Sequence, residues 1–193
     1  MREDYFLPHI FGCAILKLMH RDVVLVDHQG SAIGVMEIFA AHAAPGHLHR
    51  AFSICVFQKN KQEILIQKRA DKKPLFCCLW SNTCCSHPFP DEDVIQAGER
   101  RLQEELGFTC PLHQKGSFVY YAEDPKSGRV EYEHDTVLIG EGTGIRVMPN
   151  PQEVENCKWV PIDRLQKDIL QNPKNYTPWF AKVLNIALQY AHA

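Results

Sequence analysis

The stretch SHPFPDEDVIQAGERRLQEELGF, from Ser86 to Phe108, determines how the rest of the chain is interpreted. Its apolar residues recur at helical spacing among charged ones, which predicts a helix over residues 91–106. Gly107 follows directly, as a residue that ends a helix does. The acidic and basic side chains stand three or four positions apart. Taken alone, they are explained most simply as ion pairs on an exposed helix face.

The residues just before this segment place a thiol close to an imidazole. In WSNTCCSHP, Trp80–Pro88, Cys85 lies two positions before His87 and directly after Cys84. Both cysteines could be small buried apolar residues, the common structural role of a free cysteine. A reactive thiol is the functional alternative.

Two further segments carry groups that bind metals. In the segment Ala40–Phe52, three of the eight positions from 42 to 49 are histidines: His42, His47 and His49. Glu131 and Glu133 are two apart, so on a strand both carboxylates leave the same face and repel unless a cation lies between them. A solvated strand face explains one such pair equally well. Together with the histidines, the carboxylates favour a divalent metal.

The Ser86–Phe108 segment resembles the Nudix box. This motif consists of a Gly, five residues, a Glu, seven residues and then Arg-Glu-apolar-x-Glu-Glu-x-Gly. Glu92, Arg100 and the run from 104 to 107 match this box. Ser86 replaces its glycine and Arg101 replaces a glutamate. Nudix hydrolases hold divalent metals with these carboxylates, so exchanging one for a cation disfavours hydrolysis while keeping the scaffold.

The segment Trp80–Pro88 resembles the T-N-S-x-C-G-H-P signature of type I isopentenyl-diphosphate isomerases, which are Nudix-fold enzymes with an altered box. The resemblance implies that Cys85, not Cys84, is the catalytic thiol. The family pattern is a His, six residues, a second His and then x-A-F. It matches His42 and His49 and leaves His47 out. The implied metal ligands are His42, His49, His87, Glu131 and Glu133.

This resemblance also implies contacts to a small diphosphate substrate. It places Arg69, Lys73 and Arg101 on the phosphates, while a lysine that contacts phosphate in the family aligns with Ile38. It implies that Glu105 holds a magnesium ion bridging to the diphosphate.

The implied reaction shifts the double bond of isopentenyl diphosphate to give dimethylallyl diphosphate. Glu133 is the implied acid that protonates the alkene, and Tyr120 orients it. Cys85 would remove the C2 proton as a thiolate, for which we expect a lowered pKa near cationic groups. The indole of Trp179 would stabilise the carbocation between them.

The implied cofactors are one divalent metal at the His/Glu site (Zn²⁺, Mn²⁺ or Mg²⁺) and Mg²⁺ bound with the diphosphate. No flavin is expected, because no redox state changes. Two alternatives stay open: a Nudix hydrolase of a diphosphate substrate, and a non-catalytic metal-binding Nudix module.

The order of predicted elements favours an α+β fold, Nudix-like, with a mixed β-sheet sandwiched between α-helices. We expect one domain over residues 1–193, with an N-terminal extension (1–21) and a core (22–193). Strands are predicted around turns at 29–30, 59–62 and 125–128, then a strand and short helix over 156–169 and a closing helix over 176–191.

The composition is that of an ordinary globular protein, with 45% apolar residues and a formal net charge of −2 over 193 residues. This balance predicts neither a nucleic-acid nor an anionic-membrane partner. Eight cysteines, two pairs of them adjacent, are badly spaced for a disulfide framework. With no apolar run of about 20 residues, we expect a cytoplasmic monomer or weak homo-oligomer.

Overall fold

The structure is a computed structural model that describes residues 22–191. Its strands are β1 (Asp22–Val26), β2 (Ala32–Glu37), β3 (His49–Gln58), β4 (Glu63–Arg69), β5 (Trp80–Ser81), β6 (Cys84–Ser86), β7 (Leu112–Glu123), β8 (Val130–Glu141) and β9 (Val154–Pro161). Its helices are α2 (Ile38–Ala41), α3 (Val94–Leu106), α4 (Ile162–Gln171) and α5 (Phe180–Ala191), with a 3-10 turn η1 (Pro173–Asn175).

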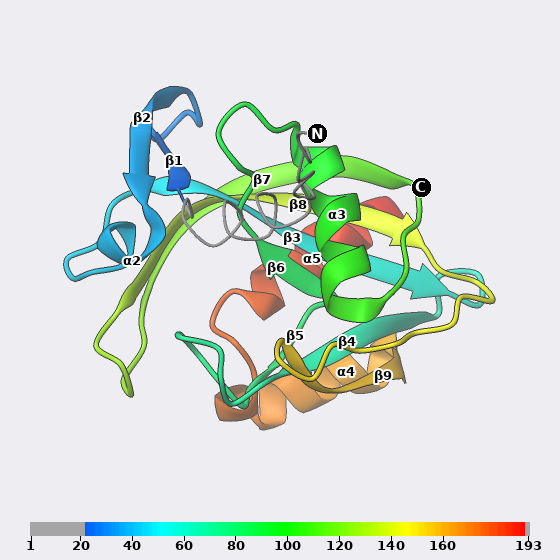
Figure 1. Cartoon of the computed structure of the whole chain (residues 1–193). Coiled ribbons are helices and arrows are strands. Elements are labelled where there is room, and N and C mark those ends of the chain that lie inside the picture. The colour runs from blue at the N-terminus through cyan, green and yellow to red at the C-terminus, as the bar shows by residue number, and fades with distance from the viewer. Residues whose placement is uncertain (1–21, 192–193) are drawn as a thin grey trace, which may run out of the picture.

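The strands form one mixed, curled sheet organised around β3 (Figure 1). Strand β3 pairs in parallel with β8 and antiparallel with β1, β4 and β6. Strands β3 and β4 form the predicted hairpin, but their ladder covers only Phe57–Ile64 and Gln58–Glu63. Beyond these pairs β3 continues along β8, whereas β4 continues along β9. The sheet therefore opens into two halves.

Side chains of β3 alternate between two apolar cores, as the period of a strand requires. Phe52, Ile54 and Val56 pack with the buried side of α3, whereas Cys55 and Phe57 pack with α5. Because helices cover both faces of the sheet (Figure 1), the predicted sandwich of a mixed sheet between helices is confirmed.

Helix α3 is the predicted helix, but it begins at Val94 rather than at Asp91. Asp91 has a φ of +65°, outside the right-handed helical region. The Asp93 carboxylate caps the helix by accepting hydrogen bonds from the amides of Ile95 (2.9 Å) and Gln96 (3.2 Å). Gly107 ends the helix with a φ of +72°, as predicted.

Two box residues brace the loop before α3 against the helix. Glu92 accepts hydrogen bonds from Arg100 Nε (2.7 Å) and Nη2 (2.8 Å), and its Oε2 also accepts from the Phe89 amide (2.8 Å). The guanidinium lies 4.1 Å from the centroid of the Phe89 ring. This bidentate pair fixes the chain entering the helix.

The closing helix begins at Phe180 rather than at Tyr176. Tyr176 is extended and forms an isolated bridge with Trp80, whose carbonyl accepts the Thr177 amide (2.9 Å). Strands β7 and β8 flank the turn predicted at 125–128. Strands β5 and β6 span two and three residues, too short for a period-2 pattern to reveal them. Within residues 22–191, no helix is long and apolar enough to cross a membrane.

Replacing Gly107 with alanine should destabilise the fold more than the same change at Gly128. Both glycines have positive φ, which costs a side chain about 1–2 kcal/mol. A Cβ at Gly107 would also lie 2.8 Å from the Met148 carbonyl oxygen, whereas one at Gly128 meets nothing within 4 Å. Urea unfolding of the two variants measures the difference; equal losses would contradict the role of the Met148 contact.

Replacing Glu92 with glutamine should make the fold less sensitive to acid. Burial alone would raise the pKa of Glu92, but the bonds from Arg100 and the Phe89 amide lower it below its ordinary value. The stabilisation is therefore present above the ordinary carboxyl pKa of about 4.3 and lost as the pH falls through the lowered one. Unfolding titrations between pH 7 and 3 should show a shallower loss in Glu92→Gln, with a lower stability at pH 7. A slope equal to wild type would refute this.

Candidate active site

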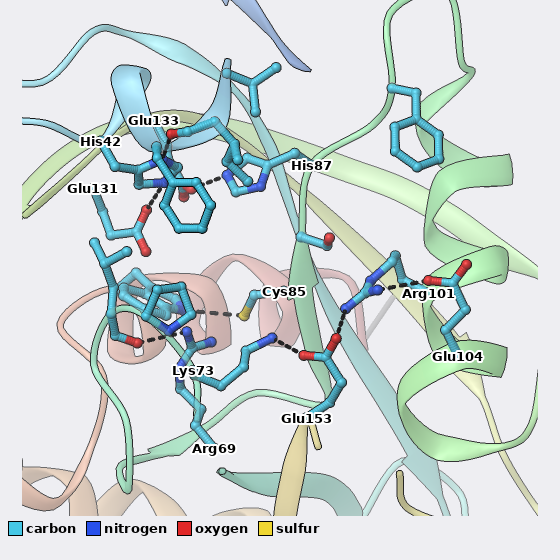
Figure 2. A pocket seen from close by; sticks show the side chains of 18 of the residues that line it. His42, Arg69, Lys73, Cys85, His87, Arg101, Glu104, Glu131, Glu133 and Glu153 are labelled. Carbon is cyan, nitrogen blue, oxygen red and sulfur yellow. Dashed lines mark hydrogen bonds and ion pairs between the residues drawn. The ribbon is translucent and has the colours of Figure 1, made fainter. Parts of the chain in front are cut away.

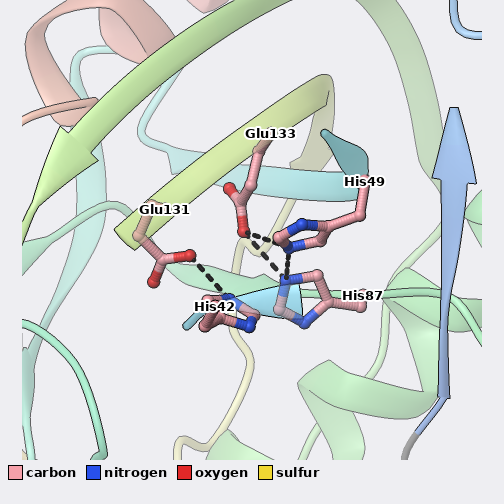
Figure 3. Close-up of side chains that lie close together, drawn as sticks. All are labelled: His42, His49, His87, Glu131 and Glu133. Carbon is pink, nitrogen blue, oxygen red and sulfur yellow. Dashed lines mark hydrogen bonds and ion pairs between the residues drawn. The ribbon is translucent and has the colours of Figure 1, made fainter. Parts of the chain in front are cut away.

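Five side chains from four parts of the fold converge on one point (Figure 3). His42 follows α2, His49 begins β3, His87 follows β6, and Glu131 and Glu133 lie on β8. The parallel register places His49 directly opposite Glu133. One potential ligand atom from each residue lies within 4.8 Å of all the others. These are the five predicted metal ligands, and the structure brings all of them together.

Backbone carbonyls orient two of the histidines toward this point. His42 Nδ1 lies 2.6 Å from the Ile38 oxygen, and His49 Nδ1 lies 2.7 Å from the His47 oxygen. A ring nitrogen facing a carbonyl must donate, so in the neutral form of each ring Nε2 has a lone pair that faces the cluster. His49 Nε2 lies 3.2 Å from His87 Nε2. Nitrogen lone pairs aimed at one point fit a shared cation.

The charges of the cluster lead to the same conclusion. Burial and the neighbouring Glu133 raise the pKa of Glu131. Burial alone would lower the pKa of His42, but Glu131, which lies 2.9 Å from His42 Nε2, raises it to about 9. Burial lowers the pKa of His87 to about 4, so this imidazole is neutral. Two buried carboxylates with three imidazoles are a donor set that suits a divalent cation.

A cavity of about 510 Å³ extends from this cluster across the substrate-contact residues that the resemblance implies. Figure 2 shows Cys85 between the His/Glu cluster and a group of charged side chains. The predicted site residues that line the cavity are His42, Arg69, Lys73, Cys85, His87, Arg101, Tyr120, Glu131, Glu133 and Trp179. His49 and Glu105 lie behind this lining and are fully buried. Ile38, which aligns with a phosphate-contacting lysine of the family, also lines it.

The Cys85 thiol is enclosed by hydrogen-bonding groups. It donates to Asn82 Oδ1 (3.0 Å), and Trp179 Nε1 donates to the sulfur (3.3 Å). Burial raises the pKa of this thiol to about 11, and Arg69 only partly opposes that rise. The expectation of a lowered pKa is therefore wrong for this pocket, because desolvation outweighs the nearby cation.

Glu133 is oriented by the neighbouring strand. Tyr120 pairs with Glu133 across β7 and β8, and its hydroxyl donates to Glu133 Oε2 (2.5 Å). Burial and the cluster carboxylates raise the pKa of Tyr120 strongly, so the phenol keeps its proton and remains a donor. The Tyr120 ring lies 5.7 Å from that of Trp179, and the two form one aromatic wall.

The three cations that the resemblance implies for the phosphates lie at the other end of the cavity, in two kinds of setting. The Arg69 guanidinium donates to the carbonyls of Phe76 (3.1 Å) and Leu75 (2.9 Å). Lys73 and Arg101 pair instead with carboxylates. This arrangement holds all three cations close to the cavity.

The fully buried Glu105 carboxylate accepts hydrogen bonds from Arg101 (2.5 Å) and Gln67 (3.1 Å). Burial would raise its pKa, but Lys73 and Arg101 lower it to about 2, so it stays charged. Its role as a magnesium ligand stays a prediction. Glu153, which also pairs with Lys73 and Arg101, was not predicted from the sequence, because no motif includes it.

Comparisons with known proteins show the family to which the chain belongs. A model of the NUDIX domain matches residues 47–180. Over 162 residues the chain is 46% identical to a Halorhodospira halophila protein named isopentenyl-diphosphate Delta-isomerase, a match that covers 84% of this chain and 92% of the relative. The chain belongs to this isomerase family. A Nocardia farcinica isopentenyl-diphosphate Delta-isomerase is also 46% identical, over 86% of this chain and 93% of its own length.

Solved structures with low sequence identity support the fold of this isomerase family member. A Deinococcus radiodurans protein superposes with a TM-score of 0.68 at 15% identity, covering 85% of this chain and 97% of its own. The NUDIX domain of NrtR from Shewanella oneidensis gives a TM-score of 0.56 at 18% identity, covering 74% and 86%. The Nudix-like α+β fold expected from the sequence is confirmed.

Metal should stabilise the protein through the five-residue cluster. Adding Mn²⁺ or Zn²⁺ to metal-free protein, at a hundred times its dissociation constant, should raise the melting temperature by about 5–10 °C. His49→Ala should abolish most of this rise, because it removes a buried ligand. His47→Ala is the matched control, since its exposed ring is outside the cluster and its carbonyl is retained. Equal metal responses in both variants would exclude this site.

Proposed function

We propose that the cavity between the His/Glu cluster and the three cations is the active site, where this isomerase family member converts isopentenyl diphosphate into dimethylallyl diphosphate. One observation carries the assignment. The Cys85 thiol and the Glu133 carboxyl, the two proton-transfer groups that the reaction needs, line the same cavity. An alkene placed between them can be protonated by one group and deprotonated by the other.

The first step requires a strong, oriented acid, because an unactivated alkene is a very weak base. We assign this step to Glu133, whose carboxyl is held by the Tyr120 hydroxyl. Its proton goes to the terminal carbon of the double bond, and a tertiary carbocation forms. A divalent cation held by His42, His49, His87, Glu131 and Glu133 would supply electron withdrawal that makes this proton more acidic.

The second step removes a proton from C2, and we assign it to Cys85. The proton moves to sulfur while the C2–H electron pair becomes the new double bond. Without substrate the thiol is the stable form, because its pKa is about 11. This thiol proton must therefore pass to Glu133, a carboxylate in the free protein because, against the effect of burial, the neighbouring histidines lower its pKa, before the alkene is protonated. Each turnover then moves one proton from Glu133 back to Cys85. The reverse reaction uses the same groups in opposite roles.

The remaining residues hold the substrate and its charge. Arg69, Lys73 and Arg101 are cations able to bind the diphosphate, and guanidinium groups match phosphate oxygens in pairs. Glu105 is the carboxylate we assign to a magnesium ion bound with the diphosphate. Trp179 lies beside Cys85 and offers its aromatic surface to the carbocation.

Hydrolysis is the poorer alternative for this pocket. Arg101 replaces a box glutamate, and its guanidinium binds Glu105. A cation at this position removes one carboxylate from the region where hydrolases hold their metals. A purely metal-binding module would not require a thiol that lines the same cavity as the Glu133 carboxyl.

Proton NMR of isopentenyl diphosphate in D₂O, with Zn²⁺, Mn²⁺ or Mg²⁺ added, tests the assignment. We expect deuterium in a dimethylallyl product, and the rates with the three metals show which of them supports the reaction best. Free phosphate would instead indicate a hydrolase, and unchanged substrate a non-catalytic module.

The proton-transfer pair can be tested in the same assay. Cys85→Ala and Glu133→Gln should each lower the rate by about 10²–10⁴-fold, the usual range for a general acid or base. Cys157→Ala is the matched control, because this cysteine lies on β9 outside the cavity lining. A Cys85→Ala protein with the full isomerase rate would refute the role of the thiol.

A further inference from the structure

We propose that Glu153 is a built-in competitor for the substrate's diphosphate. In this proposal its carboxylate occupies Lys73 and Arg101 in the substrate-free pocket, yields them when a diphosphate binds, and takes them back as product leaves. The inference rests on the proposed function, because it assigns these cations to the diphosphate.

The contacts of Glu153 are those of an anion bound in a cation site. Its Oε2 lies 2.6 Å from Lys73 Nζ, and its Oε1 lies 3.2 Å from Arg101 Nη2. One carboxylate thus engages two of the three cations assigned to the substrate. Figure 2 shows Glu153 between these two side chains. The backbone fixes this position, since the Glu153 carbonyl accepts the Ala70 amide (3.0 Å) at the start of the loop that carries Lys73.

Glu105 contacts the same two cations but cannot play this part. Its carboxylate is fully buried, is not part of the cavity lining, and is also bound by Gln67. The Glu153 side chain is 22% exposed and lines the cavity. Glu104 also lines the cavity, but its ion pairs are with arginines and not with Lys73. Of the two carboxylates that contact both Lys73 and Arg101, Glu153 is therefore the one that an incoming anion can displace.

Arg69 differs from the other two cations. It is held by carbonyl oxygens, and among residues 22–191 no carboxylate lies within ion-pair distance of it. A diphosphate can therefore bind Arg69 first without displacing anything. Its other phosphoryl group must then compete with Glu153 for Lys73 and Arg101. Neutralising Glu153 removes this competition, so the pocket should bind the anion more tightly and release it more slowly.

Titration calorimetry with inorganic diphosphate, in metal-free buffer, tests the proposal on the full chain. Glu153→Gln should bind about tenfold more tightly than wild type, because one negative charge beside the anion is removed. In the isomerase assay its KM should fall without a rise in kcat. Glu155→Gln is the matched control: this carboxylate pairs with Lys68 (2.7 Å) and lies outside the cavity lining, so its affinity should equal that of wild type.

An unchanged or weaker affinity in folded Glu153→Gln would overturn the inference, since a carboxylate that only supports the cations structurally would weaken binding when lost. If Glu153→Gln does not fold, Glu153→Asp keeps the charge but withdraws it from the cations, and it should tighten binding less than tenfold. If the wild-type protein isomerises its substrate but the variants bind inorganic diphosphate no more tightly than wild type, the inference about Glu153 is refuted and the proposed function is not. Wild-type protein that neither binds inorganic diphosphate nor isomerises refutes both.

Discussion

The parallel pairing of β3 with β8 is the constraint on which the whole site depends. Its register sets His49 beside Glu133, and the next strand pair sets Tyr120 beside the same carboxyl. Strand β6, which carries Cys85, pairs with the other edge of β3. A shift of one residue in the β3–β8 register would turn the acids and the histidine to opposite faces. The proton-transfer groups are therefore positioned by backbone hydrogen bonds in the core.

The two ends of the cavity differ in the charge of the ligand that they can bind. At one end, the carboxylates of Glu131 and Glu133 and three histidine rings converge on one point, a donor set that suits a divalent cation. At the other end, Arg69, Lys73 and Arg101 offer a site for an anion: Lys73 and Arg101 pair with carboxylates at the cavity, whereas Arg69 has no carboxylate partner among residues 22–191. Cys85 lies between these ends (Figure 2). A diphosphate with a short apolar tail fits this polarity, because its charge and its alkene belong at opposite ends.

Much of this arrangement could be predicted from the sequence, because ordered motifs fix both residue identity and relative position. The five ligands converge as the motifs imply, and the alternation of Glu131 and Glu133 places both on one face. The Cys85 pKa could not be predicted, because it depends on how deeply the thiol is buried rather than on its neighbours in the chain. Glu153 was missed for a related reason: its partners are about 50 and 80 residues away, and no local pattern marks it.

The short β3–β4 ladder has a mechanical consequence. Glu133 and Cys85 belong to the half of the sheet built on β3, whereas Arg69 and Glu153 belong to the half built on β4 and β9. The β3–β4 ladder that joins the two halves has only two residue pairs, and they lie at the end of β3 and the start of β4. The spacing between the proton-transfer groups and the cations assigned to the diphosphate therefore depends on links other than this ladder, such as the Thr83 hydroxyl, which accepts the Val56 amide of β3 and donates to the Leu65 carbonyl of β4.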